Sequence, residues 1–308
     1  MLAKRLHENP IKRFFASLVR KPLQVLAPVT YVKAQYRYIT HHKLNLKNPV
    51  RYTEKLQYLR LFVYPKNKKV ISLASRDGAR EYLKEKGLED LLIPSYGIYD
   101  RFEDIPFDKI PSPFILKCTH ASGFNEIVLD KNNWGKEKAR KKFHRYLKTD
   151  YGKKTTEPHY SPIKPRIIVE KLLLENGSLP REYKIHVFNG KAKNLYVVTG
   201  RGENIRYNQY FIDWTPFDGA QFNGWLKTDK PLEKPKNLAK LASIAESLAD
   251  DIPFVRVDLY DINGKIYFGE MTFTPAKGTL IFDDDKADFL QGEWLDISKE
   301  MALNTKKH

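Results

Sequence analysis

The feature that most constrains the fold of this chain is a pair of alternating apolar and polar runs near its C-terminal end. The runs cover residues 254–260 and 266–272, and Asn263-Gly264 stands between them. Asparagine followed by glycine is typical of a tight hairpin turn, because both residues tolerate a positive φ. Side chains alternate between the two faces of a strand, so Arg256 and Asp258 share the face opposite the apolar residues. The sequence therefore predicts an antiparallel hairpin with charged groups on one face.

The turn decides whether the acidic residues of this hairpin meet. A two-residue turn would pair Asp258 with Gly269 and would point Glu270 to the other face. A three-residue turn, with Gly264 as a left-handed bulge, would pair Asp258 with Phe268 and bring Glu270 to the charged face. We expect the three-residue turn.

In that register Asp258, Glu270 and Thr272 converge. Two facing carboxylates repel each other unless a proton or a cation lies between them. Hard oxygen ligands of this kind suit Mg²⁺ that bridges nucleotide phosphates, so we predict a Mg²⁺–nucleotide site there. The alternative is a simple ion pair between Arg256 and Glu270, with Asp258 as a surface acid.

Length and composition allow two or three small packed lobes. Of the 308 residues, 42% are hydrophobic, which is enough for a buried core. The single cysteine, Cys118, excludes an internal disulfide framework and favours a reducing compartment, so we expect a cytoplasmic protein. No apolar run reaches the length of a membrane-spanning helix, and the N-terminal residues lack the apolar segment of a signal peptide.

The chain carries a formal net charge of +17, which indicates an anionic ligand or surface. Nucleotides, acidic polysaccharides, anionic lipids and nucleic acids all have this property, and charge alone does not choose among them. The basic residues are spread along the chain and no known nucleic-acid-binding module is recognisable, so we expect no nucleic acid partner.

The N-terminal residues contain a basic helical pattern. Asn9 and Pro10 are typical of a helix start, and the following apolar residues recur at helical spacing with Lys12 and Arg13 on the other side. One hypothesis is that residues 9–21 lie on the anionic inner face of a membrane. The alternative is a helix packed on its own domain.

The rest of the chain predicts two strands that lead into loops and one further hairpin. Residues 114–118 predict a short buried strand that carries Lys117 close to its end, and residues 167–174 predict a strand that opens into a connector. Residues 183–199 predict a second hairpin with its turn at Asn189-Gly190. Mostly helical patterns cover residues 31–108, 134–154 and 238–248.

The order of these motifs resembles that of the ATP-grasp proteins. Lys117 near a strand end, the run Val169–Leu173, and the hairpin acids followed by Pro275 and Gly278 occur in the order typical of that superfamily. Several short motifs are more narrowly similar to the teichuronopeptide-synthesis-like (TupA-like) ATP-grasp family, found with bacterial surface-polysaccharide genes. These motifs are Tyr52–Gln57, Lys117–Gly123, Tyr183-Lys184 and Gly269–Pro275, within a match from about Leu44 to Gly292.

The resemblance implies an α+β fold of the ATP-grasp type, in which two α+β lobes clasp ATP and a helical region precedes them. It implies a basic helical segment over residues 1–43 and an N-terminal lobe over residues 44–110. The two ATP-grasp lobes would cover residues 111–292, with a hinge near 170–173, and residues 293–308 would form a tail.

The resemblance also implies roles for individual residues. Lys117 would bind the α- and β-phosphates as a flexible point charge. The flap over the phosphates would contain His120, Ser122 and Gly123, although Ala121 stands where the family usually has glycine. The hinge around adenine would contain Glu170, Lys171, Leu172 and Leu173.

Further residues would act on the substrate and the metal. The positive charges near the transferred phosphoryl group or the carboxylate would be Lys184, Arg201 and Arg256. Asp258 and Glu270 would bind Mg²⁺, and Thr272 would take the place of the asparagine that many of these enzymes use as the third ligand.

The implied activity is that of an ATP- and Mg²⁺-dependent ligase, which activates a carboxylate as an acyl phosphate and couples it to an amine. The carboxylate would be a small molecule or a group linked to a surface glycan. One alternative is a glycosyltransferase, for which the acidic run Asp283-Asp284-Asp285 after Phe282 would be the relevant motif. Another alternative is a basic protein that binds polyanions without turnover.

Overall fold

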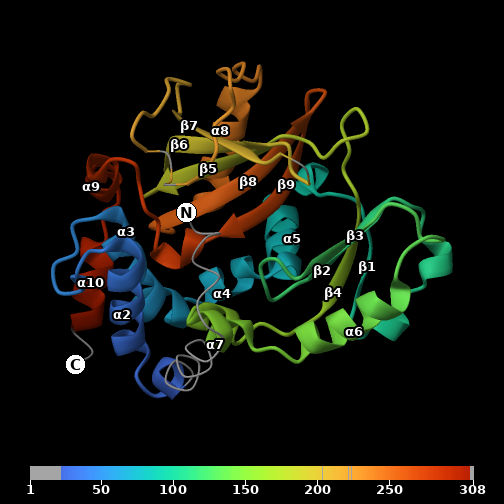
Figure 1. Ribbon diagram of the computed structural model, residues 1–308, viewed down its shortest axis with the longest axis horizontal. Coiled ribbons are helices and arrows are strands. Elements are labelled where there is room, and N and C mark those ends of the chain that lie inside the picture. The colour runs from blue at the N-terminus through green and yellow to red at the C-terminus, as the bar shows by residue number, and fades with distance from the viewer. Residues whose placement is uncertain (1–21, 203, 221, 223, 306–308) are drawn as a thin grey trace.

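The chain folds into two antiparallel sheets with helices packed around and between them (Figure 1). The computed structural model describes residues 22–202, 204–220, 222 and 224–305. The helix expected over residues 9–21 therefore lies outside the described residues. Within the described part of the chain, no helix combines the length and the apolar character needed to cross a membrane.

The larger sheet has five strands in the order β7-β6-β5-β8-β9. These strands are β5 (Glu182–Phe188), β6 (Lys191–Thr199), β7 (Arg206–Phe211), β8 (Phe254–Ile262) and β9 (Lys265–Thr272). Helix α8 (Leu238–Ala249) packs against β5, β6 and β8. Val255, Val257 and Leu259 alternate along β8 and are fully buried, so the charged residues between them point to the opposite face.

The smaller sheet has four strands in the order β1-β4-β2-β3. These strands are β1 (Ser95–Tyr99), β2 (Phe114–Cys118), β3 (Asn125–Val128) and β4 (Ile167–Lys171). Helix α6 (Lys136–Leu147) packs against β2, and its Phe143 joins Phe114 and Leu116 in a core separate from that of the larger sheet. Helix α7 (Tyr151–Thr155) follows α6. Each sheet thus has its own core, as expected for two lobes.

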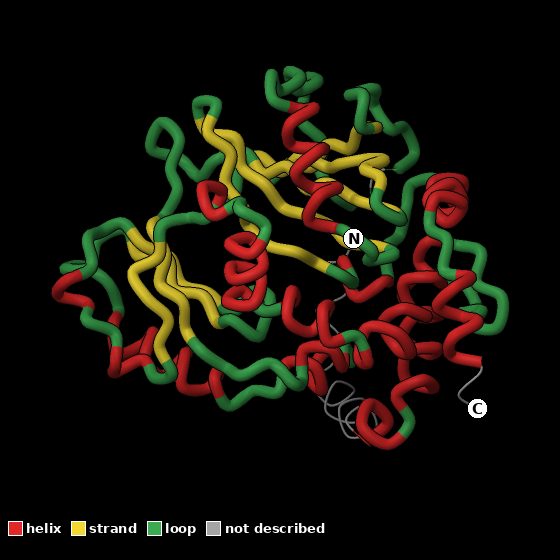
Figure 2. The backbone as a smooth tube through the Cα atoms, turned by 180° about the vertical axis from the view of Figure 1, so that it is seen from behind, coloured by secondary structure: helices red, strands yellow, loops and turns green. Residues whose placement is uncertain are grey.

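Helices from both ends of the described chain pack together at one side of the sheets (Figure 1). They are α2 (Pro28–Thr40), α3 (Tyr52–Tyr58), α9 (Asp285–Trp294) and α10 (Ser298–Thr305). The N–H and the hydroxyl of Thr53 donate to the Asp288 carboxylate at 2.9 and 2.8 Å, which joins α3 to α9. Helix α5 (Arg76–Glu85) lies between the two sheets, with α4 (Lys68–Ala74) next to it (Figure 2).

Short helical turns connect the larger elements. They are η2 (Leu59–Val63), η3 (Tyr64–Lys66), η4 (Glu89–Leu91), η5 (Phe102–Asp104), η6 (Phe107–Lys109), η7 (Pro158–Tyr160) and η8 (Pro275–Gly278). Arg60 in η2 is fully buried and donates to the carbonyl oxygens of Thr155, Thr156 and Lys277 at 2.7 to 2.8 Å. This arginine therefore ties the end of α7 to the loop that follows β9.

The hairpin turn differs from the three-residue turn that we predicted. Ile262 pairs with Lys265, so Asn263 and Gly264 form a two-residue turn. Their φ angles are 52° and 85°, and a turn with two positive φ angles matches the twist of the flanking strands. The prediction of a three-residue turn is wrong.

A bulge at Gly269 brings the acids together instead. Leu259 pairs with Phe268, whereas Asp258 pairs with Glu270, so Gly269 is the extra residue on β9. A methyl group on Gly269 would lie 3.0 Å from the backbone oxygen of Asp258, which is why glycine suits this position. The two carboxylates therefore share one face by a route that turn chemistry alone did not indicate.

Other elements agree with the sequence to different degrees. The strand over residues 114–118 and the hairpin with its turn at Asn189-Gly190 are confirmed. The long helix expected over residues 134–154 is interrupted between Leu147 and Tyr151. Strand β1 lies inside the segment that we expected to be mostly helical, and β7 was not predicted at all.

His159 makes the stability of this fold depend on pH. It is fully buried beside Tyr64, Tyr160 and Phe273, and burial, with a smaller effect of Arg60, lowers its pKa from 6.5 to about 3. The folded protein keeps this ring neutral, whereas the unfolded chain binds a proton below about pH 6.5. His159 alone should therefore lower the free energy of unfolding by about 1.4 kcal/mol per pH unit between about pH 6.5 and 3. Urea unfolding of His159→Phe should show a shallower loss between pH 7 and 5, and an unchanged slope would contradict this account.

Candidate active site in the cleft between the two sheets

The register of the larger sheet places four side chains in a row across one face. Glu270 on β9 pairs with Asp258 on β8, Asp258 pairs with Lys184 on β5, and Lys184 pairs with Tyr196 on β6. Neighbouring strands are about 5 Å apart, so adjacent members of this row are within contact distance of each other. All four side chains line a cleft between the two sheets.

The cleft has a volume of about 500 Å³, which is within the range of small-molecule sites. Its lining includes six cationic side chains and three anionic ones. The cationic ones are Arg76, Lys117, Lys171, Lys184, Arg201 and Arg256, and the anionic ones are Glu182, Asp258 and Glu270. This excess of positive charge favours a polyanionic ligand.

Cationic side chains hold both acids of the hairpin. Arg256 donates to Asp258 from Nε at 2.6 Å and from Nη2 at 2.7 Å, and its Nη2 also lies 3.2 Å from Glu270. Lys184 forms an ion pair with Asp258, and Arg76 Nη1 donates to Glu270 at 3.2 Å. The pair between Arg256 and Glu270 is therefore present, but Asp258 is 3% exposed and is not a surface acid.

The charge of Glu270 is fixed by these neighbours. Its burial alone would raise the pKa, but Arg76, Arg256 and Lys184 outweigh this effect and lower the pKa to about 2. Glu270 is therefore ionised at neutral pH, as a carboxylate that binds a cation must be.

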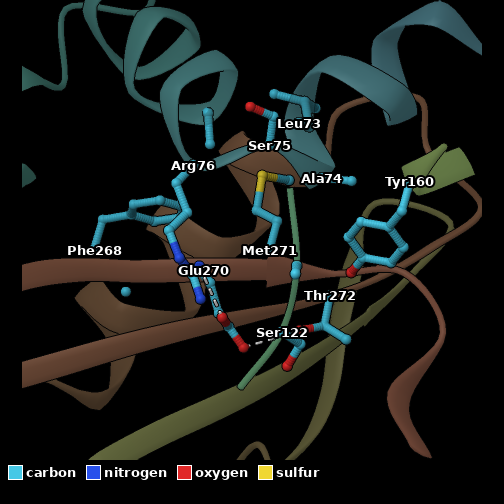
Figure 3. Close-up of a pocket in the computed structure, with 13 residues that line it drawn as sticks. Leu73, Ala74, Ser75, Arg76, Ser122, Tyr160, Phe268, Glu270, Met271 and Thr272 are labelled. Carbon is cyan, nitrogen blue, oxygen red and sulfur yellow. Dashed lines mark hydrogen bonds and ion pairs between the residues drawn. The ribbon is translucent and has the colours of Figure 1, made fainter. Parts of the chain in front are cut away.

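The donor set fits Mg²⁺ that binds together with a nucleotide. In the residues that the structure describes, no group of three or more His, Cys, Asp or Glu side chains is arranged to hold a metal ion. Mg²⁺ usually takes one or two carboxylates and fills its other positions with water and phosphate oxygens. Asp258 and Glu270 can supply these two carboxylates. The Thr272 hydroxyl lies 3.4 Å from Glu270 Oε1, on the same strand (Figure 3).

Lys117 on the smaller sheet is also held by an acid. Its Nζ lies 2.8 Å from Glu170 Oε2 on β4, and Arg80 Nη1 donates to Glu170 Oε1 at 3.1 Å. The side chains of Lys117 and Glu170 are 14% and 8% exposed, so this triad is nearly buried. Lys117 thus reaches the cleft from the sheet that faces Asp258 and Glu270.

The hinge segment after β4 has two backbone carbonyl groups without their sheet partners. The Lys171 N–H donates to the Pro94 carbonyl at 2.9 Å, and the Leu172 N–H donates to the Pro113 carbonyl at 3.4 Å. In an antiparallel pair the two residues normally exchange a second bond in return, but proline has no N–H. The carbonyl oxygens of Lys171 and Leu172 therefore lack this bond, and Leu173 lines the cleft beside them.

The expected flap over residues 120–123 is a short loop whose exposed tip lies between two buried residues, His120 and Phe124. His120 is buried and does not line the cleft, and burial lowers its pKa. Phe124 stacks on Tyr146 with ring centroids 3.9 Å apart. Ser122 and Gly123, between these two anchors, are exposed and line the cleft. The structure thus brings Ser122 and Gly123 to the cleft and places the buried His120 behind them, so a ligand contact of His120 stays a prediction.

Arg201 lies beside the row, where it contacts Glu182 on β5. Its Nη2 donates to Glu182 at 2.7 Å, and the Lys184 Nζ lies 2.7 Å from the same carboxylate. Glu182 therefore links the two cationic residues that the sequence singled out, although it was not itself predicted. Alternation along β5 places Glu182 and Lys184 on one face, which was the signal available in the sequence.

Two arginines from α5 were also missed. Arg76 and Arg80 are four residues apart, so they share one face of the helix. They contact Glu270 on the larger sheet and Glu170 on the smaller sheet, respectively. The sequence predicted only a helical pattern here, because nothing in that pattern indicates that the helix lies between two sheets.

The acidic run Asp283-Asp284-Asp285 does not line the cleft. Asp284 caps α9 by accepting from the Lys286 N–H. Asp285 forms ion pairs with Arg51 at 2.7 Å and with His42 at 3.1 Å. Two of the three acids that would support a glycosyltransferase therefore have structural partners.

Two facing sheets, each with its own core and with charged groups turned into one cleft, make up an α+β fold of the ATP-grasp class. A sequence profile described as TupA-like ATP-grasp matches residues 54–296, which is most of the chain. The chain therefore belongs to the TupA-like ATP-grasp family. No match was found among curated proteins.

Solved structures that are similar to this chain include two ligases. The D-alanine–D-alanine ligase from Bacillus anthracis complexed with ATP is 14% identical with a TM-score of 0.46, and the match covers 78% of this chain and 70% of that one. The L-amino acid ligase from Bacillus licheniformis is 14% identical with a TM-score of 0.45, and the match covers 68% of this chain and 45% of that one. Similarity at this level says nothing about substrates.

Proposed function

We propose that the protein is an ATP-dependent ligase that activates a carboxylate as an acyl phosphate and couples it to an amine. One observation carries this proposal: Asp258 and Glu270 on one sheet face Lys117 on the other across a single cationic cleft. A nucleotide with its bound metal ion carries negative phosphate groups for Lys117 and a positive charge for Asp258 and Glu270.

The proposed reaction forms an amide in two transfers. A carboxylate oxygen attacks the γ-phosphorus of ATP, the bond to the bridging oxygen breaks, and ADP leaves with the electron pair. The amine loses a proton and attacks the acyl carbon, and inorganic phosphate leaves with the electrons of the carbon–oxygen bond. Catalysis of such a transfer depends mainly on positioning and on neutralisation of charge.

Residues of both sheets would bind the nucleotide, the substrate and the metal ion. Lys117 would bind the phosphate chain, and the N–H groups of Ser122 and Gly123 would approach it where small side chains leave the backbone accessible. Lys184 and Arg256 would bind the transferred phosphoryl group or the carboxylate. Mg²⁺ held by Asp258, Glu270 and Thr272 would supply further neutralisation of phosphate charge. Arg201 would add positive charge from beside the row.

Adenine would bind at the hinge. The carbonyl oxygens of Lys171 and Leu172 would accept hydrogen bonds from its amino group, and Leu172 and Leu173 would contact the ring. Glu170 would act indirectly, because its side chain holds Lys117.

We also propose that the chain is divided into residues 1–43, 44–110, 111–292 and 293–308, with the hinge near residues 170–173.

Pro94→Ala tests the role of the hinge carbonyl groups. The new N–H can donate to the Lys171 carbonyl and compete with adenine, and a neutral hydrogen bond is worth about 0.5 to 1.5 kcal/mol. We expect the dissociation constant of ADP with Mg²⁺, measured by titration calorimetry, to rise about 3- to 10-fold. Pro231→Ala, in an exposed loop, should leave this constant unchanged. Equal constants for the two variants would contradict the assignment.

We further propose that the reaction takes place in the cytoplasm and modifies a precursor of a bacterial surface polysaccharide. The carboxylate would be a small molecule or a group on the glycan. The net charge of +17 supports this choice, because it would retain an acidic polymer near the cleft.

The direct test is an assay of nucleotide products over a panel of uronic acids, amino acids and amines, with mass spectrometry of the coupled product. We expect ADP and inorganic phosphate together with an amide. Formation of AMP and pyrophosphate would contradict the acyl phosphate. Turnover of a nucleotide sugar without ATP would favour a glycosyltransferase, and salt-sensitive polyanion binding without any ATP turnover would favour a binding protein.

A further inference from the structure

The main chain at Arg76 is fixed to the smaller sheet. Arg76 is the first residue of α5, and its N–H donates to the Thr119 carbonyl at 3.1 Å, directly after β2. The next residue, Asp77, forms an ion pair with Arg166, which directly precedes β4. Two neighbouring strands of the smaller sheet therefore hold the start of this helix in place.

The Arg76 side chain crosses to the larger sheet (Figure 3). Its Nη1 donates to Glu270 at 3.2 Å, and the side chain is 15% exposed. Its Nε is buried and has no hydrogen-bond partner among the residues that the structure describes. A buried donor without a partner costs about 1 to 3 kcal/mol, so this guanidinium is held at the cleft with unused hydrogen-bonding capacity. Ser122 of the loop tip lines the same cleft.

Arg80 on the same helix face shows how differently a purely structural arginine is bound. Its guanidinium donates to Glu170, to the Ile93 carbonyl at 3.0 Å and to the Ser95 hydroxyl at 3.3 Å. It does not line the cleft. Arg80 is therefore engaged on the smaller lobe, whereas among the described residues Arg76 has one acidic hydrogen-bond partner, Glu270, and its Nε has none.

We propose that Arg76 releases Glu270 when nucleotide and metal bind, and that it then donates to the terminal phosphate. This inference rests on the proposed ATP-dependent function. It assigns a phosphate-binding role to a residue that comes from neither sheet and that the sequence did not single out.

The charges of the cleft give the reason for this exchange. Without ligand, Arg76 and Arg256 both neutralise Glu270. A divalent cation bound to a carboxylate repels a guanidinium next to that carboxylate. Binding of the metal therefore weakens the ion pair between Arg76 and Glu270. The terminal phosphate offers several acceptor oxygens, which a planar guanidinium can bind in a bidentate manner. Because the Arg76 main chain is fixed, only the side chain has to move.

Binding measurements on Arg76→Gln test this exchange, with AMP-PNP and ADP as probes in the presence of Mg²⁺. We expect the affinity for AMP-PNP to fall about 10- to 100-fold, since a charged hydrogen bond is lost, and the affinity for ADP to change less than about 3-fold. Free Mn²⁺, followed by electron paramagnetic resonance without nucleotide, should bind the variant more tightly than the wild type, because one competing cation is gone. If the role of Arg76 were only structural, the substitution would not lower the affinity for AMP-PNP while it raises the affinity for Mn²⁺.

Arg76→Lys keeps the charge but not the planar fork, so its loss of AMP-PNP affinity should be smaller. Lys84→Gln, at the exposed end of the same helix, should match the wild type in every measurement. Unchanged AMP-PNP binding in Arg76→Gln, or equal losses for AMP-PNP and ADP, would overturn the inference. If thermal unfolding shows that Arg76→Gln does not fold, Arg76→Lys decides by the same comparison. A wild-type protein that binds neither nucleotide would instead overturn the proposed function.

Discussion

Replacing Glu270 with glutamine should lower conversion of ATP to ADP by about 1000-fold or more. Glutamine keeps the shape of the side chain but removes the anionic oxygen that Mg²⁺ requires. A catalytic metal ion stabilises the transition state by several kcal/mol, and each 1.4 kcal/mol corresponds to about a factor of ten in rate. Asp258→Asn should have an effect of similar size. Both variants should also lose Mn²⁺ binding in the presence of ADP, measured by electron paramagnetic resonance.

The matched control for this prediction is Glu293→Gln, which changes an exposed acid on α9. Its turnover and metal binding should equal those of the wild type. Thermal unfolding should confirm that Glu270→Gln remains folded, since Arg256 and Arg76 can still donate to the amide oxygen. Turnover in Glu270→Gln within about 10-fold of the wild type would exclude this carboxylate as a metal ligand.

Lys117→Met should lower the same turnover by about 100- to 1000-fold, which is the usual effect of removing one group that stabilises developing charge. Glu170 keeps Arg80 as a partner in this variant, so no buried acid is left unpaired and the fold should be retained. The Michaelis constant for ATP should also rise, because Lys117 would contact the phosphates before the transfer. Steady-state kinetics of ADP release measure both effects.

Lys138→Met provides the control, because Lys138 is exposed on α6 of the same lobe. It should behave as the wild type. Lys117→Arg should recover only part of the lost activity, because a branched planar group does not fit the place of a compact ammonium. Full activity of Lys117→Met would remove the smaller sheet from the proposed mechanism.

The acids and cations of the cleft neutralise one another before any ligand binds. Asp258 is held by Arg256 and Lys184, and Glu270 by Arg256 and Arg76. A metal ion alone would have to displace these side chains and leave their charges unpaired, which is costly in a buried site. A nucleotide supplies phosphate oxygens for the displaced cations, so metal and nucleotide should bind together.

The acidic hairpin was predictable from the sequence because it depends on local pattern, whereas the fold class was implied by the resemblance of the motifs to ATP-grasp proteins. Alternation along β8 fixes which side Asp258 faces, and Asn263-Gly264 fixes where the chain turns. We predicted that Asp258 and Glu270 share one face, but with Asp258 opposite Phe268, whereas Asp258 pairs directly with Glu270. This pairing depends on a bulge at Gly269, and a bulge depends on packing across strands that local turn rules do not describe.

Residues that act across lobes were the ones that sequence reasoning missed. Arg76 lies far along the chain from Glu270, and only the packing of α5 between two sheets brings the two together. The burial of His120 was not foreseen either, because a histidine in a loop of small residues gives no sign of burial in the sequence. The carbonyl groups of Lys171 and Leu172 lack a sheet hydrogen bond because Pro94 and Pro113 lie opposite them. The sequence alone does not show which residues lie opposite, because the sheet order is needed for that.

The most direct measurement is a crystal structure of the full chain with AMP-PNP and Mg²⁺. The account predicts the nucleotide between the two sheets, a metal ion about 2.1 Å from carboxylate oxygens of Asp258 and Glu270, and Lys117 Nζ in contact with phosphate oxygens. A nucleotide bound elsewhere, or one bound in the cleft while Lys117 stays on Glu170 and no metal reaches either acid, would contradict it.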